Sequence, residues 1–188
     1  GFHNTADKVS NTTVIGSENT VTNSKNSLVM GDNREVKDAN HAVLIGSTDS
    51  KTTTSVNNAV AVGHNTNVTV EGGVALGSES KATVAAGSVG YDPSTKAQST
   101  NTDSTWKATK SAVSVGDANN NITRQITSVA AGTKDTDAVN VAQLKKLQNQ
   151  VNATGSTTVS AGKHINVTTT TNGTTKDYKV SLSDDITN

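Results

Sequence analysis

Large apolar residues recur in pairs along the first half of the chain, separated by one residue and followed at once by glycine. Five glycines close these segments, Gly16, Gly31, Gly46, Gly63 and Gly77, and they are 15, 15, 17 and 14 residues apart. A sixth copy, ending at Gly116, follows a gap. Repetition at a short fixed period predicts stacked coils that contact only their neighbours. The copies read Thr13-Val14-Ile15, Leu28-Val29-Met30, Val43-Leu44-Ile45, Val60-Ala61-Val62, Val74-Ala75-Leu76 and Val113-Ser114-Val115 before the glycine.

Each period is long enough for two strands of about five residues and two turns. Side chains alternate along a strand, so we expect the residues one and three places before each glycine to fill the coil interior. The middle residues then point outwards, and most of them are apolar. This outward set has two interpretations: chance in a chain rich in Val and Ala, or a second buried surface where coils pack against copies of themselves. The middle residues are Val14, Val29, Leu44, Ala61, Ala75 and Ser114.

The glycines are expected to serve turns with positive φ or close approach between coils.

Composition supports a thin solenoid, because only 31% of residues are hydrophobic and 2% aromatic. Disordered chains usually carry high net charge and few β-branched residues, whereas this chain has a formal net charge of zero and abundant Val and Thr. Zero net charge gives no electrostatic attraction to nucleic acid or anionic membranes. Cysteine is absent, which excludes disulfides and thiol chemistry.

A polar stretch at 91–110 interrupts the repeats and holds the single tryptophan, Trp106, together with Tyr91. Exposed aromatic residues in a polar loop can be binding hot spots, so both are candidate ligand contacts. The interpretation we prefer for Trp106 is that it pins the loop onto the body of the protein.

Beyond the repeats, the spacing of apolar residues predicts a helix that begins near Asp137 and is capped by Thr136 or Asp137. Leu144, Leu147 and Val151 keep the three-four spacing of a coiled-coil seam, with Asn140 one step earlier. Fewer than two heptads are too short to be stable alone, so neighbouring helices are needed. The segment 155–188 returns to strands, with Asn172-Gly173 as a hairpin turn signal.

Residues 124–144, Arg-Gln-Ile-Thr-Ser-Val-Ala-Ala-Gly-Thr through Asp-Ala-Val-Asn-Val-Ala-Gln-Leu, resemble the neck of trimeric autotransporter adhesins. The Val-Ala-Val-Gly and Val-Ala-Leu-Gly copies resemble the repeats of that family's YadA-like head. The resemblance implies a mainly β chain with a left-handed parallel β-roll head, three chains side by side, and a neck that leads into a short trimeric coiled coil. A small β-rich module would follow.

On this interpretation the chain divides into six segments. The expected boundaries are 1–90 for the head repeats, 91–110 for an insertion, 111–121 for the last head coil, 122–143 for the neck, 144–154 for the coiled-coil stalk and 155–188 for the start of a further β-rich module.

The resemblance also implies a function. Such heads attach bacteria to host extracellular-matrix proteins or cell-surface receptors, and some self-associate between cells, through many weak contacts on a homotrimer. Display on a Gram-negative outer membrane is expected, with the signal peptide and the anchor outside these residues. No cofactor, metal or nucleic acid is expected. An enzyme would need converging acids and bases, whereas the histidines are scattered at His3, His41, His64 and His164. A trimeric viral or phage tail-fibre segment is the alternative that stays open.

Overall fold

The computed structural model describes residues 1–154 and 157–186, so residues 155, 156, 187 and 188 of the expected C-terminal module lie outside the described residues. The chain forms two compact units, Gly1–Thr127 and Ser128–Asn188. The first unit contains β1 (Thr5–Ser10), β2 (Thr13–Ser17), β3 (Thr20–Lys25), β4 (Leu28–Asp32), β5 (Arg34–Lys37), β6 (Val43–Ile45), β7 (Thr52–Thr54), β8 (Val60–Val62), β9 (Asn67–Val68), β10 (Val74–Leu76), β11 (Lys81–Ala82), β12 (Tyr91–Asp92), β13 (Ala97–Gln98), β14 (Val113–Ser114) and a 3-10 turn, Ala118–Asn120.

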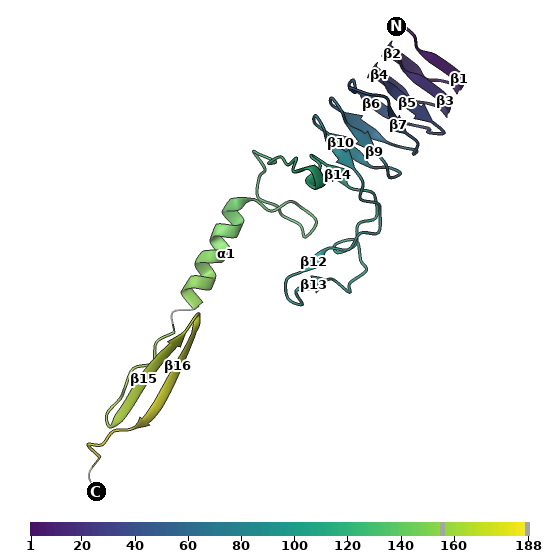
Figure 1. Cartoon of the computed structure of the whole chain (residues 1–188). Helices are drawn as coiled ribbons and strands as arrows, with labels where there is room; N and C mark the ends of the chain where they lie inside the picture. The colour runs from purple at the N-terminus through teal and green to yellow at the C-terminus, as the bar shows by residue number, and fades with distance from the viewer. Residues whose placement is uncertain (155–156, 187–188) are drawn as a thin grey trace. The chain divides into compact units, whose positions relative to one another are not determined.

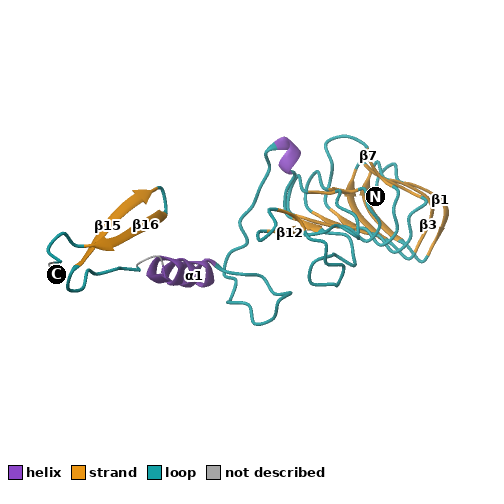
Figure 2. Ribbon diagram, turned by 90° about the horizontal axis from the view of Figure 1, so that it is seen from below, coloured by secondary structure: helices purple, strands orange, loops and turns teal. Residues whose placement is uncertain are grey.

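Strands of successive coils pair in parallel, which confirms the β-solenoid (Figures 1 and 2). One sheet has the order β1-β3-β5-β7 and the other β14-β10-β8-β6-β4-β2, while β9 and β11 form a short sheet of their own. In the longer sheet each repeat lies in register with the next, so that Val14 pairs with Val29 and Val29 with Leu44. The period read from the sequence is therefore the length of one coil.

Left-handed residues at fixed places turn the chain at the corners of each coil. One such row consists of Asn11, Asn26, His41 and Asn58, with φ of 47°, 54°, 56° and 57°. Asparagine accepts this conformation more readily than most residues because its short polar side chain can hydrogen-bond locally. The polar turns of the sequence thus supply the corners that keep successive strands in register.

The solenoid interior holds the middle residue of each repeat, so the expected orientation of the repeats is wrong. Val29, Leu44, Ala61 and Ala75 are fully buried, and Val14 is half-buried against them. The flanking residues, such as Ile15, face outwards instead. The coil is narrow, and the apolar side chains inside it are Val and Ala, with Leu44 the largest. The sequence pattern assigns the two flanking residues of each repeat to the interior and the middle residue to the surface, and the structure has the opposite arrangement.

A polar ladder runs along the solenoid beside this apolar core, from the exposed Asn4 to buried residues of the next coils. The Asn4 Nδ2 atom donates to the Gly16 carbonyl at 2.7 Å, and Asn19 Nδ2 donates to the Gly31 carbonyl at the same distance. Arg34 takes the next position, and its Nε atom donates to the Gly46 carbonyl at 2.9 Å. A side chain twelve residues earlier therefore satisfies the glycine carbonyl of each of these coils.

Arg34 reaches further along the ladder than the asparagines do. It is fully buried, and its Nη1 atom donates to the Thr66 carbonyl at 2.6 Å, while Nη2 donates to Thr66 Oγ1 at 2.9 Å. Burial lowers the pKa of the Arg34 guanidinium. The coil between Gly46 and Gly63 is the 17-residue one, and the residue that pairs with Arg34 there is Thr52, whose hydroxyl donates to the Ser50 carbonyl instead of along the ladder. Arg34 thus supplies donors that the longer coil does not provide for itself.

A two-stranded ribbon leaves the solenoid between β11 and β14; we call residues 85–110 the arm. Its two halves run antiparallel: Gly87 N donates to the Ala108 carbonyl and Gly90 N to the Trp106 carbonyl, both at 2.7 Å. The β12–β13 hairpin lies at the far end of the ribbon. Ser111, at the root, donates from Oγ to the Glu71 carbonyl at 2.6 Å and so holds the root on the solenoid.

The second unit contains one helix and one hairpin. Helix α1 spans Val141–Thr154, and β15 (Ile165–Asn172) pairs antiparallel with β16 (Thr175–Leu182). Asn172 and Thr175 face each other as the last pair of the ladder, so Gly173 is the first central residue of the turn, with φ of 61°. A glycine at that place allows a tight two-residue turn whose twist matches the strands.

Candidate functional site

The longer sheet presents large apolar side chains to solvent. We call the residues that flank the buried middle positions the outward face. Ile15, Met30, Val62, Leu76 and Val113 are 49%, 38%, 37%, 40% and 61% exposed. Contiguous apolar patches on a protein surface mark interaction sites. Its two rows are Leu28, Val43, Val60, Val74 and Val113, and Ile15, Met30, Ile45, Val62 and Leu76.

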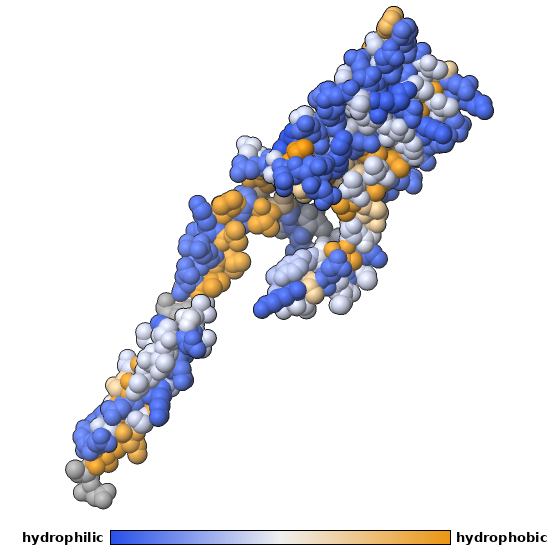
Figure 3. Space-filling view, in the orientation of Figure 1, coloured by the Kyte–Doolittle hydropathy of each residue, from blue (hydrophilic) through white to orange (hydrophobic). Residues whose placement is uncertain are grey.

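Helix α1 carries a second uncovered apolar stripe, and none of its residues is buried. Leu144, Leu147 and Val151 are 61%, 55% and 61% exposed, and Val141 is 67% exposed. Figure 3 shows the apolar atoms gathered along one side of the helix. The three residues predicted as a seam thus lie on one exposed apolar stripe of the helix.

Asn140 is the residue before the helix, whereas the sequence predicts it as part of the seam. Its Oδ1 atom accepts from Gln143 N at 3.1 Å, and Gln143 Oε1 accepts from Asn140 N at 3.2 Å. This reciprocal pair is a capping box, so Asn140 caps the helix in place of the expected Thr136 or Asp137. Gln143 is a residue that the sequence reasoning missed, although the Asn-x-x-Gln spacing signals it.

Gln143 also holds the loop that precedes the helix, residues 128–139, which we call the neck loop. Its Nε2 atom donates to the Gly132 carbonyl at 3.0 Å, and Gly132 N donates back to Gln143 Oε1 at 3.2 Å. Asn140 Nδ2 donates to the Val129 carbonyl at 3.1 Å. Two amide side chains therefore fasten an otherwise exposed loop onto the first turn of α1.

Asp137 orders the turn just ahead of the cap. Its Oδ2 atom accepts from Lys134 N and Thr133 N, both at 2.9 Å. Hydrogen bonds from the backbone amides of Lys134 and Thr133 lower the pKa of Asp137, since they favour the charged carboxylate. Asp137 therefore stabilises the neck loop by accepting from two of its backbone amides.

Arg124 fastens the start of the neck to the last coils of the solenoid. Its Nη2 atom donates to the Ser78 carbonyl and its Nη1 atom to the Val115 carbonyl, both at 2.8 Å. The guanidinium lies over Gly77, where an added Cβ would come within 3.0 Å of Arg124 Cζ. Because Arg124 opens the motif predicted as the neck, that segment carries its own attachment to the solenoid.

The repeat glycines lie where successive coils touch. A Cβ added at Gly31 would lie 2.4 Å from the Gly46 carbonyl oxygen, and the φ of Gly31 is 144°. At Gly116 an added Cβ would lie 2.2 Å from the Ile122 carbonyl oxygen. Gly16, Gly46, Gly63 and Gly77 also have positive φ, of 125°, 131°, 134° and 94°.

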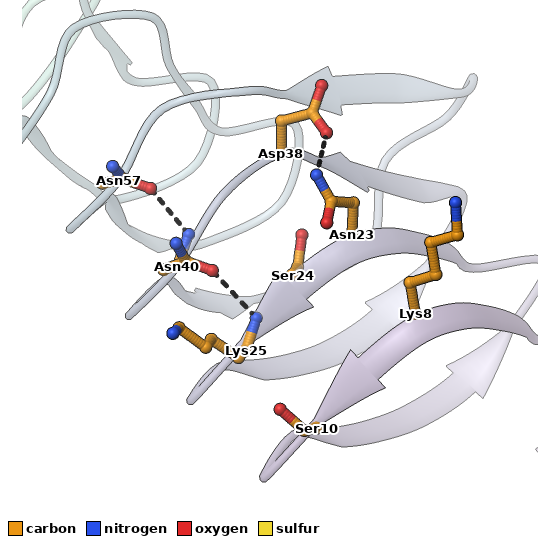
Figure 4. Close-up of a pocket in the computed structure, with 8 residues that line it drawn as sticks. All are labelled: Lys8, Ser10, Asn23, Ser24, Lys25, Asp38, Asn40 and Asn57. Carbon is orange, nitrogen blue, oxygen red and sulfur yellow. Dashed lines mark hydrogen bonds between the residues drawn. The ribbon is translucent and has the colours of Figure 1, made fainter.

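A polar hollow of about 330 Å³ lies at a corner of the first coils (Figure 4). Adjacent coils are tied across it by side-chain amides: Asn40 Oδ1 accepts from Lys25 N at 3.1 Å, and Asn57 Oδ1 accepts from Asn40 N at 2.8 Å. Asn23 Nδ2 donates to Asp38 Oδ1 at 2.7 Å. These bonds link one coil to the next, which gives the hollow a structural role.

The two aromatic candidates both lie in the arm. Tyr91 is 63% exposed on β12, and Trp106 is half-buried where the returning half of the ribbon begins. The Trp106 carbonyl accepts from Gly90 N, so its backbone belongs to the ribbon itself.

Histidines and acidic residues do not converge. His3 contacts Glu18 at 2.8 Å and His64 contacts Asp49 at 3.1 Å, both as exposed pairs on the solenoid. Within the described ranges, no group of three or more His, Cys, Asp or Glu side chains is placed to hold a metal ion. In the same ranges, no helix is both long and apolar enough to cross a membrane.

Part of the chain is similar to known proteins. The family model for the coiled stalk of trimeric autotransporter adhesins matches residues 125–167. Autotransporter adhesin BadA of Bartonella henselae is 43% identical over 90 residues, which are 48% of this chain and 3% of that protein. Trimeric autotransporter adhesin AtaA of Acinetobacter sp. (strain Tol 5) is 52% identical over 80 residues, 40% of this chain and 2% of that protein. The resemblance to trimeric autotransporter adhesins is confirmed.

Among solved structures, the C-terminal YadA-like domain of a Burkholderia pseudomallei protein is 30% identical, with a TM-score of 0.40, and the match covers 52% of this chain and 45% of that one. The matched residues are only 3% of BadA and 2% of AtaA, so the chain spans a small part of these two relatives. These relatives are bacterial adhesins by name, so the tail-fibre alternative is not favoured.

Proposed function

We propose that this chain is a head-and-neck segment of a homotrimeric surface adhesin without catalytic activity. It would attach a Gram-negative bacterium to host extracellular-matrix proteins or cell-surface receptors and would link cells that display the same adhesin. The observation that carries the proposal is the pair of uncovered apolar surfaces, the outward face and the α1 stripe, in a chain similar to trimeric autotransporter adhesins.

The outward face supports side-by-side assembly of solenoids. Its two rows run along the stack of coils, so a second copy can cover them over the whole length of the sheet. Sheets pack face to face about 10 Å apart, a distance that apolar residues such as Ile15 and Leu76 would fill. The stripe of Leu144, Leu147 and Val151 also supports assembly from several copies, because a helix of 14 residues needs partner helices.

Adhesion by such a trimer relies on repetition. Two of the pockets in the described residues are open and mainly polar, which is unlike the enclosed apolar sites that bind small molecules. Three identical faces on one fibre raise the effective concentration of each weak contact and increase avidity without a tight pocket. Tyr91 and Trp106 stay candidate ligand contacts under this proposal.

Sedimentation equilibrium over a concentration series tests the assembly. We expect a species of about three times 19.2 kDa. Val62→Lys places a charge on the outward face and should give monomers with an unchanged far-UV circular dichroism spectrum. Thr53→Lys places the same charge on the exposed side of β7, in the other sheet, and should leave the trimer intact. A wild-type chain that is monomeric at every concentration would contradict the proposal.

Adhesion is then measured with beads that carry the trimer. We expect capture by at least one of a panel of matrix proteins or by cultured host cells, or clumping of the beads. Beads with the same number of Val62→Lys monomers should bind far less, because avidity is lost. A stable trimer that does none of these things would refute the adhesive role and leave the assembly standing.

A further inference from the structure

The arm has no core of its own. None of its residues is buried, and Tyr91, at its far end, is 63% exposed. An isolated two-stranded ribbon is at best marginally stable in water. The backbone bonds between its two halves, such as Gly90 N to the Trp106 carbonyl, order the ribbon but bury little apolar surface.

The solenoid of the same chain does not supply the missing cover. Among the hydrogen bonds and ion pairs of the described residues, those of 85–110 stay within the ribbon and its root. The root itself is held at Ser111, which binds Glu71, and at Ala112, whose carbonyl accepts from Val74 N at 3.1 Å. The arm is thus fixed at one end and uncovered along its length.

The root of the arm is continuous with the outward face. Val113, the first residue of β14, follows the arm after Ser111 and Ala112; it pairs with Val74 in the longer sheet and is 61% exposed. Val84, immediately before the arm, is 49% exposed and its carbonyl accepts from Ala112 N at 2.9 Å. A copy that covers the outward face therefore also comes alongside the root.

We infer that the arm packs on a neighbouring copy of this chain, with Tyr91 and Trp106 as its anchors; the inference rests on the proposed trimer. The outgoing half of the ribbon, residues 85–94, is about ten residues long and spans up to about 33 Å when extended, several times the roughly 10 Å between packed sheets. Three lysines and two aspartates leave the arm with little net charge, which favours a mixed protein surface over a strongly charged partner.

Site-directed photo-cross-linking tests the contact in the whole chain, because the protein has no native cysteine. Tyr91→Cys carries a short maleimide–benzophenone probe, and Lys37→Cys, on the exposed side of β5, carries the same probe as the matched control. We expect Tyr91→Cys to give covalent dimers and trimers on denaturing gels, whereas Lys37→Cys should give monomers. In parallel, the single Trp106 should be several-fold less accessible to iodide in the trimer than in Val62→Lys monomers.

Sedimentation of each labelled sample separates the two ways of failing. A trimer without Tyr91 cross-links and with freely quenched Trp106 would overturn the inference and leave the arm open to an external partner. A sample without trimers would instead refute the assembly itself, and the inference with it.

Discussion

Arg34→Lys is the sharpest test of the interior ladder. Both side chains are cations, so the exchange keeps a basic residue in the interior and removes hydrogen bonds. In lysine a methylene takes the place of Arg34 Nε, and the Gly46 carbonyl loses its donor at 2.9 Å. The ammonium can still serve the Thr66 carbonyl and hydroxyl, but it lacks the planar fork that reaches all of these groups together.

The expected cost follows from that single loss. Leaving a buried carbonyl without a partner costs about 1–3 kcal/mol, and a hydrogen bond to a charged donor contributes about 1.5–3 kcal/mol. These figures describe overlapping parts of the same loss, so we expect Arg34→Lys to lower the free energy of unfolding by about 2–4 kcal/mol. That is a large share of the 5–15 kcal/mol typical of a folded domain.

Urea unfolding at one fixed protein concentration, followed by far-UV circular dichroism, measures this difference. Lys37→Arg, the reverse exchange at an exposed position of β5, should leave the midpoint unchanged. An Arg34→Lys variant with the wild-type midpoint and slope would show that the guanidinium bonds contribute nothing, and the reasoning would fall.

Three further outcomes are expected. Gly46→Ala should destabilise the solenoid by more than about 2 kcal/mol in thermal unfolding, because Gly46 has φ of 131° and the new Cβ would lie 2.3 Å from the Gly63 carbonyl oxygen; Gly162→Ala, which meets nothing within 4 Å, should be neutral. Asn140→Ala should lower helix stability by about 1 kcal/mol and speed hydrogen exchange at the Gln143 amide, while equal exchange rates would argue against the cap. Asp137 has a lowered pKa, so its contribution to the neck loop is complete above the ordinary aspartate pKa of about 3.9 and is lost as the pH falls through the folded value. Amide chemical shifts of Thr133 and Lys134 should follow this titration, and Asp137→Asn should abolish it.

The residues of the neck show how much of the candidate site the sequence predicts. Leu144, Leu147 and Val151 follow from helical spacing alone, and they do form one exposed stripe. The capping box of Asn140 and Gln143 is a local pattern that the sequence contains. Arg124 and Ser78 are 46 residues apart in the sequence, and no pattern near Arg124 predicts their contact.

The sequence by itself determined the length of one coil and the alternation of side chains along its strands. The glycine period sets the length of one turn, and the alternation of side chains places the middle residue of each repeat opposite its two neighbours. Which of these sets faces inwards was decided by the tertiary structure, because alternation is unchanged when the two faces are exchanged. Two strands that close a narrow coil leave space for Val29, Ala61 and Ala75 inside, and the larger Ile15 and Met30 are left on the surface. The same closure buries Arg34, whose partners come from two other coils, so no local pattern could show that a charged residue belongs in the interior.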